Sequence, residues 1–368
     1  MSEAAGGPAV VVPYDPAGLP AGLDRIAPRD VLDRWGAVDR SSHDPRLVLV
    51  GDQDRPRGAA LVTARPGTAY LKIVDAVGDA RRAALAVVEH ARERGLVQVK
   101  WEGWTATAAP AAGGFRPLRA PTAADDAQPA AGYVRWLDDV DLDEPAHYRQ
   151  TTHFTCGAAG AAMAQAHLGG LGGEALDRRL ELSLWREATN FPACDPVRLG
   201  LAVHRRWPGS GVVVALDTDG PVIVEAYPEG DRDWRALLQE LSREDAAAAG
   251  LPVDGRCLTL PALRAALDGG ERVLLLVSLT TMLGVDVPHW VLCHAAVPGA
   301  VVVEDPWVGT TVGETWVDAH LLPVADSALD EMSTMEAAGY RAAVRIGVGG
   351  RSAHGERRPP PRADPDRP

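Results

Sequence analysis

The chain has 368 residues, of which 46% are hydrophobic and 24% charged, so it can bury a sizeable core and is not a disordered acidic polymer. At roughly 150 residues per domain, this length favours two domains. The formal net charge of −13 repels phosphates and anionic headgroups, and no apolar run approaches the ~20 residues of a membrane helix. We therefore expect neither a nucleic-acid nor a membrane partner.

Cysteine usage and the N-terminus indicate the compartment. The 4 cysteines are too few for a disulfide framework in a chain of this length, and none of them pairs in CxxC spacing. Residues 1–20 lack the basic segment and apolar stretch of a secretory signal. We therefore expect a protein of the reducing cytoplasm.

The first part of the chain predicts a small α/β domain at residues 20–137, after an N-terminal extension at residues 1–19. Its helix is expected at residues 80–94, where apolar side chains recur at helical spacing between Asp79 and Gly95. Acidic residues then predict a linker at residues 138–147. The expected strands are short apolar runs separated by Gly, Pro and Asp: residues 46–50, 58–63, 70–76, 96–101 and 133–137.

Residues 148–348 predict a second domain, in which helices precede an antiparallel sheet, so we expect an α+β fold. A Pro298–Gly299 turn joins the last two central strands as a hairpin. The tail at residues 349–368 is rich in Arg, Pro and Asp, which is typical of disorder. The helices are expected at residues 156–168, 174–183, 197–206, 234–243 and 260–268, and the strands or extended segments at 211–216, 222–225, 273–279, 290–297, 300–304 and 341–348.

A cysteine at the start of a helix is the first candidate for chemistry. Gln150 opens a polar loop that runs into an alanine-rich helix beginning at Cys156. The amides and dipole of a helix N-terminus favour the thiolate, which is the nucleophilic form of cysteine. The alternative is a buried structural cysteine, the common fate of a free thiol.

The predicted hairpin brings a base and its orienting group together, because His289 and Asp305 lie on its two arms. On a strand, His289 shares a face with Cys293, while Trp290 and His294 point the other way. Only one of the two histidines can face the helix. We expect it to be His289, with His294 a packing or surface residue and Cys293 a core residue.

Gln150, Cys156-Gly157, His289 and Asp305-Pro306 together resemble the papain-like cysteine peptidases that process the double-glycine leaders of bacteriocins. In that family the glutamine precedes the nucleophile by six residues and the aspartate follows the histidine by sixteen, as positions 150, 156, 289 and 305 do here. The resemblance covers residues 148–348 and implies a papain-like fold with a helical subdomain and an antiparallel sheet. A closer resemblance is to stand-alone proteins of this fold that carry the segment at residues 184–189 and often follow an acetyltransferase-like domain.

The resemblance implies nucleophilic acyl transfer. The Cys156 thiolate would attack a carbonyl, His289 would hold and deliver the proton, and Asp305 would orient the imidazole. The Gln150 amide and the Cys156 backbone N–H would donate to the oxyanion, a contribution of ~3 kcal/mol per donor. For Gln150 alone, a loop hydrogen bond is the alternative.

Three functions follow from this set of residues. The leading hypothesis is a hydrolase that cleaves a peptide or peptide-like amide through an acyl-thioester, with a small peptide or a carrier protein as candidate partners. The same Cys-His-Asp set could instead serve an acyltransferase or amide synthase in a biosynthetic pathway. A non-catalytic binding protein is the third.

Substrate contacts are expected from Trp185, Glu187 and Asn190, with Trp290 beside the histidine. Glu187 and Asn190 would contact an amine or amide, and Trp185 would supply an apolar surface. An ordinary helix end is the alternative for residues 184–190.

Zinc binding is a competing interpretation, because His153, Cys156, His289, Cys293 and His294 are of ligand types that zinc prefers. Strand alternation points His294 away and leaves no fourth ligand. We therefore expect no metal.

The order of elements in residues 20–137 resembles GNAT-type N-acetyltransferases, which hold the pyrophosphate of acetyl-CoA on a glycine-rich loop at a helix start. Here that loop, at residues 77–82, has one glycine, and Asp79 would bring a negative charge against the phosphates. The resemblance therefore implies a degenerate domain without acetyl transfer or cofactor, serving as a partner or substrate platform.

Overall fold

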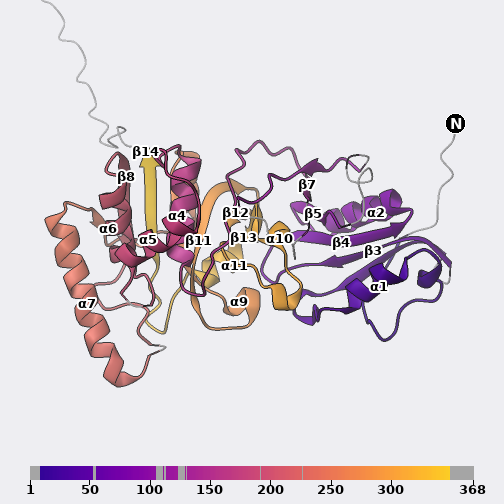
Figure 1. Cartoon of the computed structure of the whole chain (residues 1–368), viewed down its shortest axis with the longest axis horizontal. Coiled ribbons are helices and arrows are strands. Elements are labelled where there is room, and N and C mark those ends of the chain that lie inside the picture. The colour runs from indigo at the N-terminus through magenta and orange to yellow at the C-terminus, as the bar shows by residue number, and fades with distance from the viewer. Residues whose placement is uncertain are drawn as a thin grey trace, which may run out of the picture.

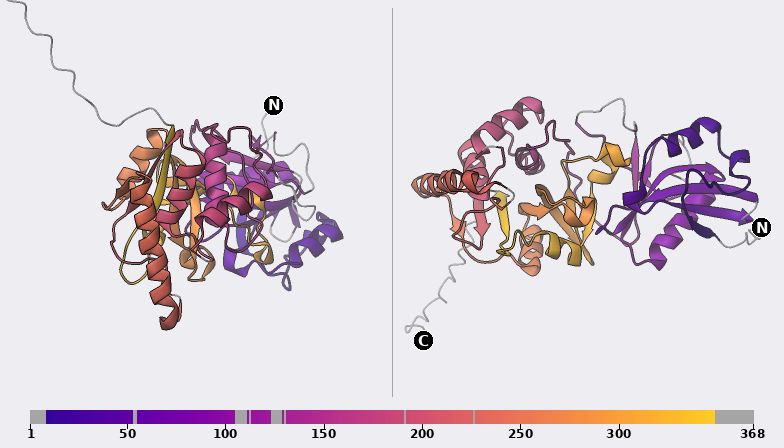
Figure 2. Two further views of the ribbon diagram at one scale, coloured as in Figure 1. Left: turned by 60° about the vertical axis from the view of Figure 1, so that its left-hand side comes forward. Right: turned by 90° about the horizontal axis from the view of Figure 1, so that it is seen from below.

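The computed structural model describes residues 9–52, 55–104, 111, 113–122, 129, 131–190, 192–225 and 227–348. They form two sheets with helices packed on their faces, which is the predicted α+β class. The two sheets lie next to each other along the long axis of an elongated molecule (Figure 1), as the right-hand view of Figure 2 also shows. The predicted disorder of residues 349–368 falls outside the described residues.

The first sheet has the strand order β1-β2-β3-β4-β5-β7-β6. β4 and β5 run parallel because helix α2 connects them as a crossover, and the other pairs are antiparallel. α2 packs on one face, and α1, which the sequence did not predict, packs on the other. The elements are β1 (Val10–Pro13), η1 (Leu23–Arg25), α1 (Arg29–Gly36), η2 (Ser41–His43), β2 (Arg46–Asp52), β3 (Arg55–Thr63), β4 (Tyr70–Gly78), α2 (Ala80–Glu93), β5 (Gln98–Glu102), β6 (Arg116–Pro117) and β7 (Gly132–Trp136).

The second sheet has the order β13-β12-β11-β10-β14-β8-β9, with β10, β11 and β12 antiparallel as predicted. α4, α5 and α6 pack on one face, and α8 and α11 pack on the other. The strands are β8 (Ser210–Leu216), β9 (Val253–Asp254), β10 (Arg272–Ser278), β11 (Pro288–Val297), β12 (Ala300–Glu304), β13 (Leu322–Ala325) and β14 (Ala342–Val348). The helices are α4 (Cys156–His167), α5 (Arg178–Ala188), α6 (Pro196–Arg206), α7 (Glu229–Ala248), α8 (Leu260–Asp268), α9 (Thr280–Leu283), η3 (Thr310–Val312), α10 (Trp316–Ala319) and α11 (Asp326–Met332).

Two expected elements of the second half differ from the structure. The helix predicted at residues 174–183 begins at Arg178, because the Asp177 side chain accepts from the backbone N–H groups of Arg179 and Leu180. The extended segment predicted at residues 222–225 is not a strand. Ile223 has a φ of 55°, in the left-handed region, which a strand does not allow.

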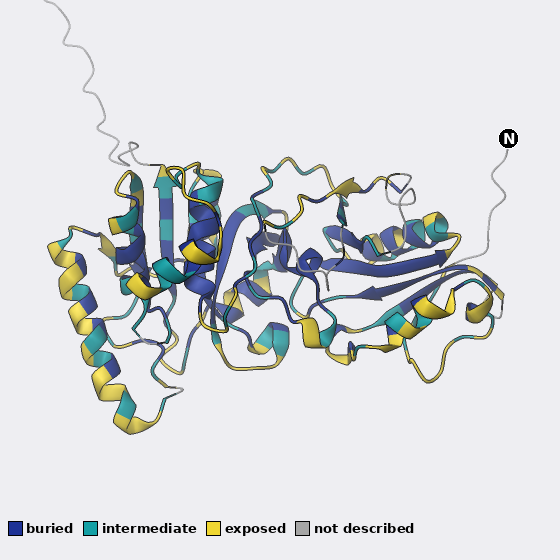
Figure 3. Ribbon diagram, viewed as in Figure 1, coloured by how far each residue is buried: buried dark blue, intermediate teal, exposed yellow. Residues whose placement is uncertain are grey.

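The two sheets share a buried core. Ala69 and Val134 of the first sheet pack with Trp316 and Val317 of the second half in one apolar cluster. The strands of both sheets are buried along most of their length, whereas α7 is exposed along much of its surface (Figure 3). Residues 138–147, the predicted linker, contain neither helix nor strand. None of the described helices has the length and apolar character needed to span a bilayer.

Candidate active site

Cys156 is the first residue of α4, and His289 is the second residue of β11. α4 lies against β11 because its alanines and glycines allow close approach. A Cβ added at Gly157 would come within 3.1 Å of Leu199 and of Trp290, which is the residue after His289. The N-terminus of the helix thereby meets the start of the strand.

His289 lies between Cys156 and Asp305. Its Nε2 is 2.7 Å from Asp305 Oδ1, and its ring also hydrogen bonds the Cys156 thiol. Since Nε2 faces the carboxylate, Nδ1 is the nitrogen left for the sulfur. The hairpin of β11 and β12 therefore brings His289 and Asp305 together, which is the proximity that the sequence predicts.

The electrostatics of this site favour an ion pair. Burial raises the pKa of the Cys156 thiol, but the charge and hydrogen bond of His289, with the backbone N–H groups of Trp290 and Gly157, lower it on balance. Burial lowers the pKa of His289, but Asp305 and Cys156 raise it to about 10. Both shifts favour a thiolate beside an imidazolium.

The strand faces differ from the prediction in one respect. His289 does share its face with Cys293, which is a core residue, but α4 packs on the opposite face, that of Trp290. His289 still reaches Cys156, because the thiol lies at the helix start, where the strand begins. His294 is buried, with Nε2 3.5 Å from an oxygen of Glu304.

Gln150 is almost fully buried and lines the same pocket as His289. Its backbone N–H donates to Pro306 O at 2.9 Å, which fixes the loop beside Asp305. Its side-chain Nε2 donates to Thr152 O at 2.6 Å. An amide nitrogen carries two hydrogens, so one remains for an oxyanion. The loop hydrogen bond and the predicted oxyanion contact are therefore compatible.

Glu181, on α5, holds the loop that carries Gln150, and the sequence did not point to it. Its carboxylate accepts from the Thr151 backbone N–H at 2.8 Å and the Tyr148 hydroxyl at 2.8 Å, and from the Thr155 hydroxyl. Glu181 is fully buried. In the sequence, Glu181 is recognisable only as an acidic residue on the apolar side of a helix, and this pattern does not distinguish a residue of a functional site.

Arg65 also contacts the site without having been predicted. It follows β3 in the first half of the chain, and its guanidinium donates to Asp305 Oδ2 and to both oxygens of Glu314. Glu314 also accepts from His43 Nε2 at 2.7 Å. These partners are far apart in sequence, so no local motif relates them.

The predicted substrate contacts are not gathered at this pocket. Trp290 is 2% exposed and donates its indole N–H to Cys194 O at 3.1 Å, so it is a core residue and this prediction is wrong. Glu187 pairs with Arg206 at 3.0 Å on the surface, which matches an ordinary helix end.

Trp185 and Asn190 also have partners within the helical subdomain. The Trp185 indole donates to Pro192 O at 3.0 Å, and its ring lies 4.8 Å from that of Phe154, in the loop before Cys156. Asn190 Nδ2 donates to Asp195 and to the Ser242 hydroxyl. Trp185 therefore supports the loop of the nucleophile through Phe154, and Asn190 braces the start of α6.

A pocket of about 450 Å³ opens beside His289. Gln150 and His289 supply its polar wall. Leu279, Leu283, Val285, Val287 and Pro288 supply an apolar wall, and Ser42, His153, Trp307, Gly309, Thr311 and Val312 complete the lining. The site therefore has room for an apolar group next to the candidate catalytic residues.

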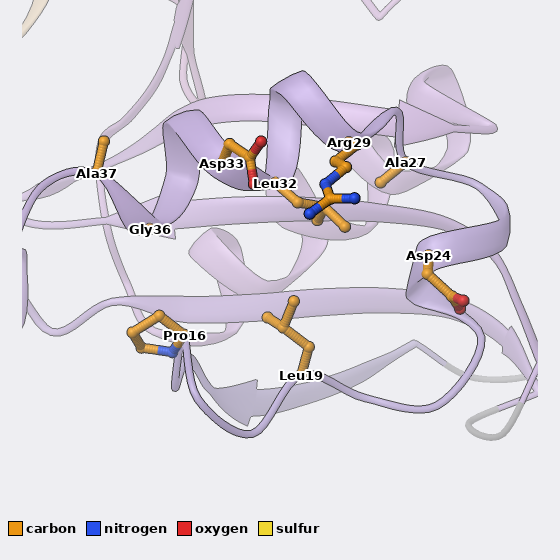
Figure 4. A pocket seen from close by; sticks show the side chains of 9 residues that line it. All are labelled: Pro16, Leu19, Asp24, Ala27, Arg29, Leu32, Asp33, Gly36 and Ala37. Carbon is orange, nitrogen blue, oxygen red and sulfur yellow. The ribbon is translucent and has the colours of Figure 1, made fainter.

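A second hollow, of about 760 Å³, lies in the N-terminal half. Figure 4 shows Pro16 and Leu19 on one side and Arg29, Leu32 and Asp33 of α1 on the other. None of its lining residues belongs to the site at His289.

A metal could be held by one group of the described residues, His147, Glu304 and His320, whose ligand atoms lie within 4.8 Å of one another. Both imidazoles place Nδ1 at 2.7 and 2.8 Å from the same oxygen of Glu304, which is the geometry of hydrogen bonds. The five residues weighed for zinc are not among these three.

Asp79, in the loop between β4 and α2, is the N-cap of α2, and its carboxylate accepts from the Arg82 backbone N–H at 3.1 Å. The carboxylate therefore lies at the helix start, where the sequence places it. The loss of acetyl-CoA binding stays a prediction.

Comparison with solved structures finds low identity throughout. A C39-like peptidase from Bacillus anthracis is 10% identical (TM-score 0.27), covering 55% of this chain and 98% of its own. A probable GNAT acetyltransferase from Chromobacterium violaceum is 18% identical (TM-score 0.27), covering 36% and 91%. A Bacillus subtilis acetyltransferase in complex with CoA is 13% identical (TM-score 0.21), covering 30% and 84%.

Among curated proteins, none matches the chain. A family model does match, over residues 145–347, which is more than half of the chain and includes Gln150, Cys156, His289 and Asp305. The narrower bacteriocin-processing assignment stays a prediction. The chain belongs to the Peptidase_C39 like family.

Proposed function

We propose that this protein is a cysteine-dependent hydrolase that cleaves a peptide or peptide-like amide through an acyl-thioester. The observation that carries the proposal is the buried chain of contacts from Cys156 through His289 to Asp305, which stabilises a thiolate. Family membership supports it at the level of a peptidase-like enzyme.

The other cysteines support the choice of nucleophile by contrast. Burial raises the pKa of Cys194 and of Cys293, and burial with a hydrogen bond to Asp217 raises that of Cys257. Only Cys156 has an imidazole partner that lowers its pKa. Thiolate chemistry near neutral pH is therefore expected from this cysteine alone.

The proposed reaction begins with attack of the Cys156 thiolate on the substrate carbonyl carbon. The Cys156 backbone N–H and the second amide hydrogen of Gln150 donate to the oxyanion. The His289 imidazolium then gives its proton to the leaving nitrogen as the C–N bond breaks, leaving a thioester. Neutral His289 next takes a proton from water as the water oxygen attacks the thioester. The C–S bond then breaks and releases the acid, which leaves the Cys156 thiolate beside the His289 imidazolium. Asp305 keeps the imidazole in one orientation throughout.

The apolar wall of the pocket supports a preference for substrates with an apolar side chain beside the scissile amide. Leu279, Leu283, Val285 and Val287 line it next to His289. Burying a side chain the size of leucine there would contribute ~1.5–3 kcal/mol to binding. A charged side chain would lose hydration without gaining a partner on this wall.

A panel of fluorogenic peptide amides that differ in the residue before the amide tests the proposal. We expect release of the fluorophore to be fastest with leucine, valine or methionine, and to be abolished in Cys156→Ala, whose fold circular dichroism should show unchanged. Mass spectrometry of products formed in water with a competing amine separates hydrolysis from transfer to the amine. Full activity of Cys156→Ala would remove the proposed nucleophile.

A further inference from the structure

Arg65 comes from the first half of the chain, yet its guanidinium contacts Asp305, 240 residues further along. Its Nη1 donates to Asp305 Oδ2, which is the oxygen that His289 leaves free. Its Nε and Nη2 donate to the two oxygens of Glu314 at 2.6 and 2.8 Å. A guanidinium is a planar fork with fixed donors, so the two bonds to Glu314 hold Arg65 in place and the third bond restrains Oδ2 of Asp305.

The charges of this cluster require a cation between the carboxylates. The side chains of Arg65, Asp305 and Glu314 are all 0% exposed. Burial raises the pKa of both carboxyl groups, but the charges of His289 at Asp305 and of Arg65 at both lower them below their usual values. Without the guanidinium, two buried carboxylates close together would tend to share a proton.

The backbone around Arg65 is fixed to the second sheet. Ala325 of β13 donates its backbone N–H to Gly67 O at 3.0 Å. Gly67 has a φ of 75°, and a Cβ there would lie 3.1 Å from Thr281 and from Ala328. Glycine therefore allows both the turn and the close approach, and Arg65 has little freedom to leave Asp305.

We propose that Arg65 is a positioning residue that holds Asp305 toward His289, so that the N-terminal half completes the active site. The inference rests on the proposed function, because it assigns Arg65 a role through the same Cys156–His289–Asp305 set. The proposal assigns the acetyltransferase-like half a role other than acetyl transfer. The peptidase-like half then depends on its neighbour for the permanent cation at Asp305 Oδ2, whereas its own His289 contacts Oδ1.

The test compares Arg65→Met with Lys72→Met in the full-length chain. Lys72 is a matched control because it is also a buried cation of the first half that pairs across the interface, with Asp318. Its other partners are Glu102 and Gly313 O, so its printed bonds go to neither Asp305 nor His289. The measurements are the apparent pKa of Cys156, from iodoacetamide alkylation rates between pH 5 and 9, and kcat and KM on the best fluorogenic amide.

In Arg65→Met we expect the apparent pKa of Cys156 to rise by at least about one unit, because a shared proton on Asp305 removes the anion that stabilises the imidazolium. We expect kcat to fall roughly 10- to 100-fold with little change in KM. Lys72→Met should lower thermal stability but leave both readouts near wild type. In an Asp305→Asn background, Arg65→Met should change neither readout further.

The outcomes separate the two proposals. If wild-type Cys156 reacts no faster than Cys257, the proposed function fails, and the role of Arg65 fails with it. If Cys156 is reactive but Arg65→Met behaves like Lys72→Met, only the role of Arg65 is overturned. An equally large effect of Arg65→Met in the Asp305→Asn background would also overturn it, since the effect would not pass through Asp305.

A conservative pair covers the case in which Arg65→Met does not fold. Arg65→Lys keeps one charge but loses the fork, so it should shift the apparent pKa of Cys156 in the same direction by a smaller amount. Lys72→Arg should leave that pKa unchanged. Identical alkylation profiles for these two variants would contradict the proposal.

Discussion

Glu304 is the last residue of β12, Asp305 follows it, and both carboxylates are fully buried. Asp305 faces His289 and the guanidinium of Arg65, a cation at every physiological pH. Glu304 faces histidines instead: His147 at 2.7 Å, His320 at 2.8 Å and His294 at 3.5 Å. Both neighbours in sequence thus contact histidine, but Asp305 also pairs with a permanent cation.

This difference in partners distinguishes Asp305, which contacts the candidate catalytic residues, from Glu304, which stabilises the fold. One oxygen of Asp305 contacts the imidazole that in turn contacts Cys156. The other oxygen accepts from Arg65, which is permanently charged. Glu304 contacts no residue of the pocket. Burial raises the pKa of Glu304, but the charge of His320 and hydrogen bonds from three histidines hold it well below its usual value. Glu304 therefore ties His147, just before the Gln150 loop, to the sheet.

The largest effect on turnover is expected from Asp305→Asn. The neutral amide of asparagine cannot stabilise the imidazolium. It can face His289 with either its N–H or its carbonyl, so it does not fix one tautomer of the imidazole, and kcat should fall on the order of 10³-fold. Single-turnover kinetics on the best amide substrate measure it. A fall in kcat of less than about tenfold would mean that Asp305, like Glu304, only supports the fold.

The next effect concerns Gln150, whose backbone is fixed beside Asp305 through Pro306. Because the oxyanion contact forms mainly in the transition state, Gln150→Ala should lower kcat by ~100-fold with little change in KM. Gln150→Glu should be at least as damaging, since it brings negative charge to the developing oxyanion. A variant that loses thermal stability but keeps its rate per folded molecule would make Gln150 a loop brace only.

The smallest effect on turnover is expected from Glu304→Gln, which should keep kcat within about threefold while losing about 3–5 kcal/mol of stability. Denaturant unfolding measures the loss. The carboxylate, with its lowered pKa, stabilises the fold above the usual Glu pKa of ~4.3. His320, with its raised pKa, stabilises it until pH exceeds that pKa. The advantage of wild type should therefore be lost at both ends of this window, and a pH-independent difference would contradict the pairing.

The sequence predicted the parts of the site that depend on local pattern. The Pro298–Gly299 turn and the alternating strand pattern predict the hairpin, and the 2.7 Å contact between His289 and Asp305 follows from it. The start of α4 was predicted from the run of alanines after Cys156. These features depend on residues near in sequence, for which periodicity and turn chemistry are informative.

The remaining parts depend on contacts between distant segments. Arg65 lies in a turn after β3 and meets Asp305 only because the two sheets pack together. Trp290 was expected at the substrate, but in the structure its side chain lies on the face of β11 that α4 covers. The sequence shows the alternation of side chains along the strand, but tertiary packing determines which face of the strand α4 covers.

The most direct test of the central claim is the order in which the cysteines of the native protein react with iodoacetamide at pH 6. Cys257 is exposed, whereas Cys156 is only 9% exposed, so accessibility alone favours Cys257. We predict that peptide mapping finds Cys156 modified first, with a rate that changes little from pH 6 to 9. His289→Ala should remove this advantage, because the imidazole lowers the thiol pKa. Modification of Cys257 before Cys156 would contradict the account.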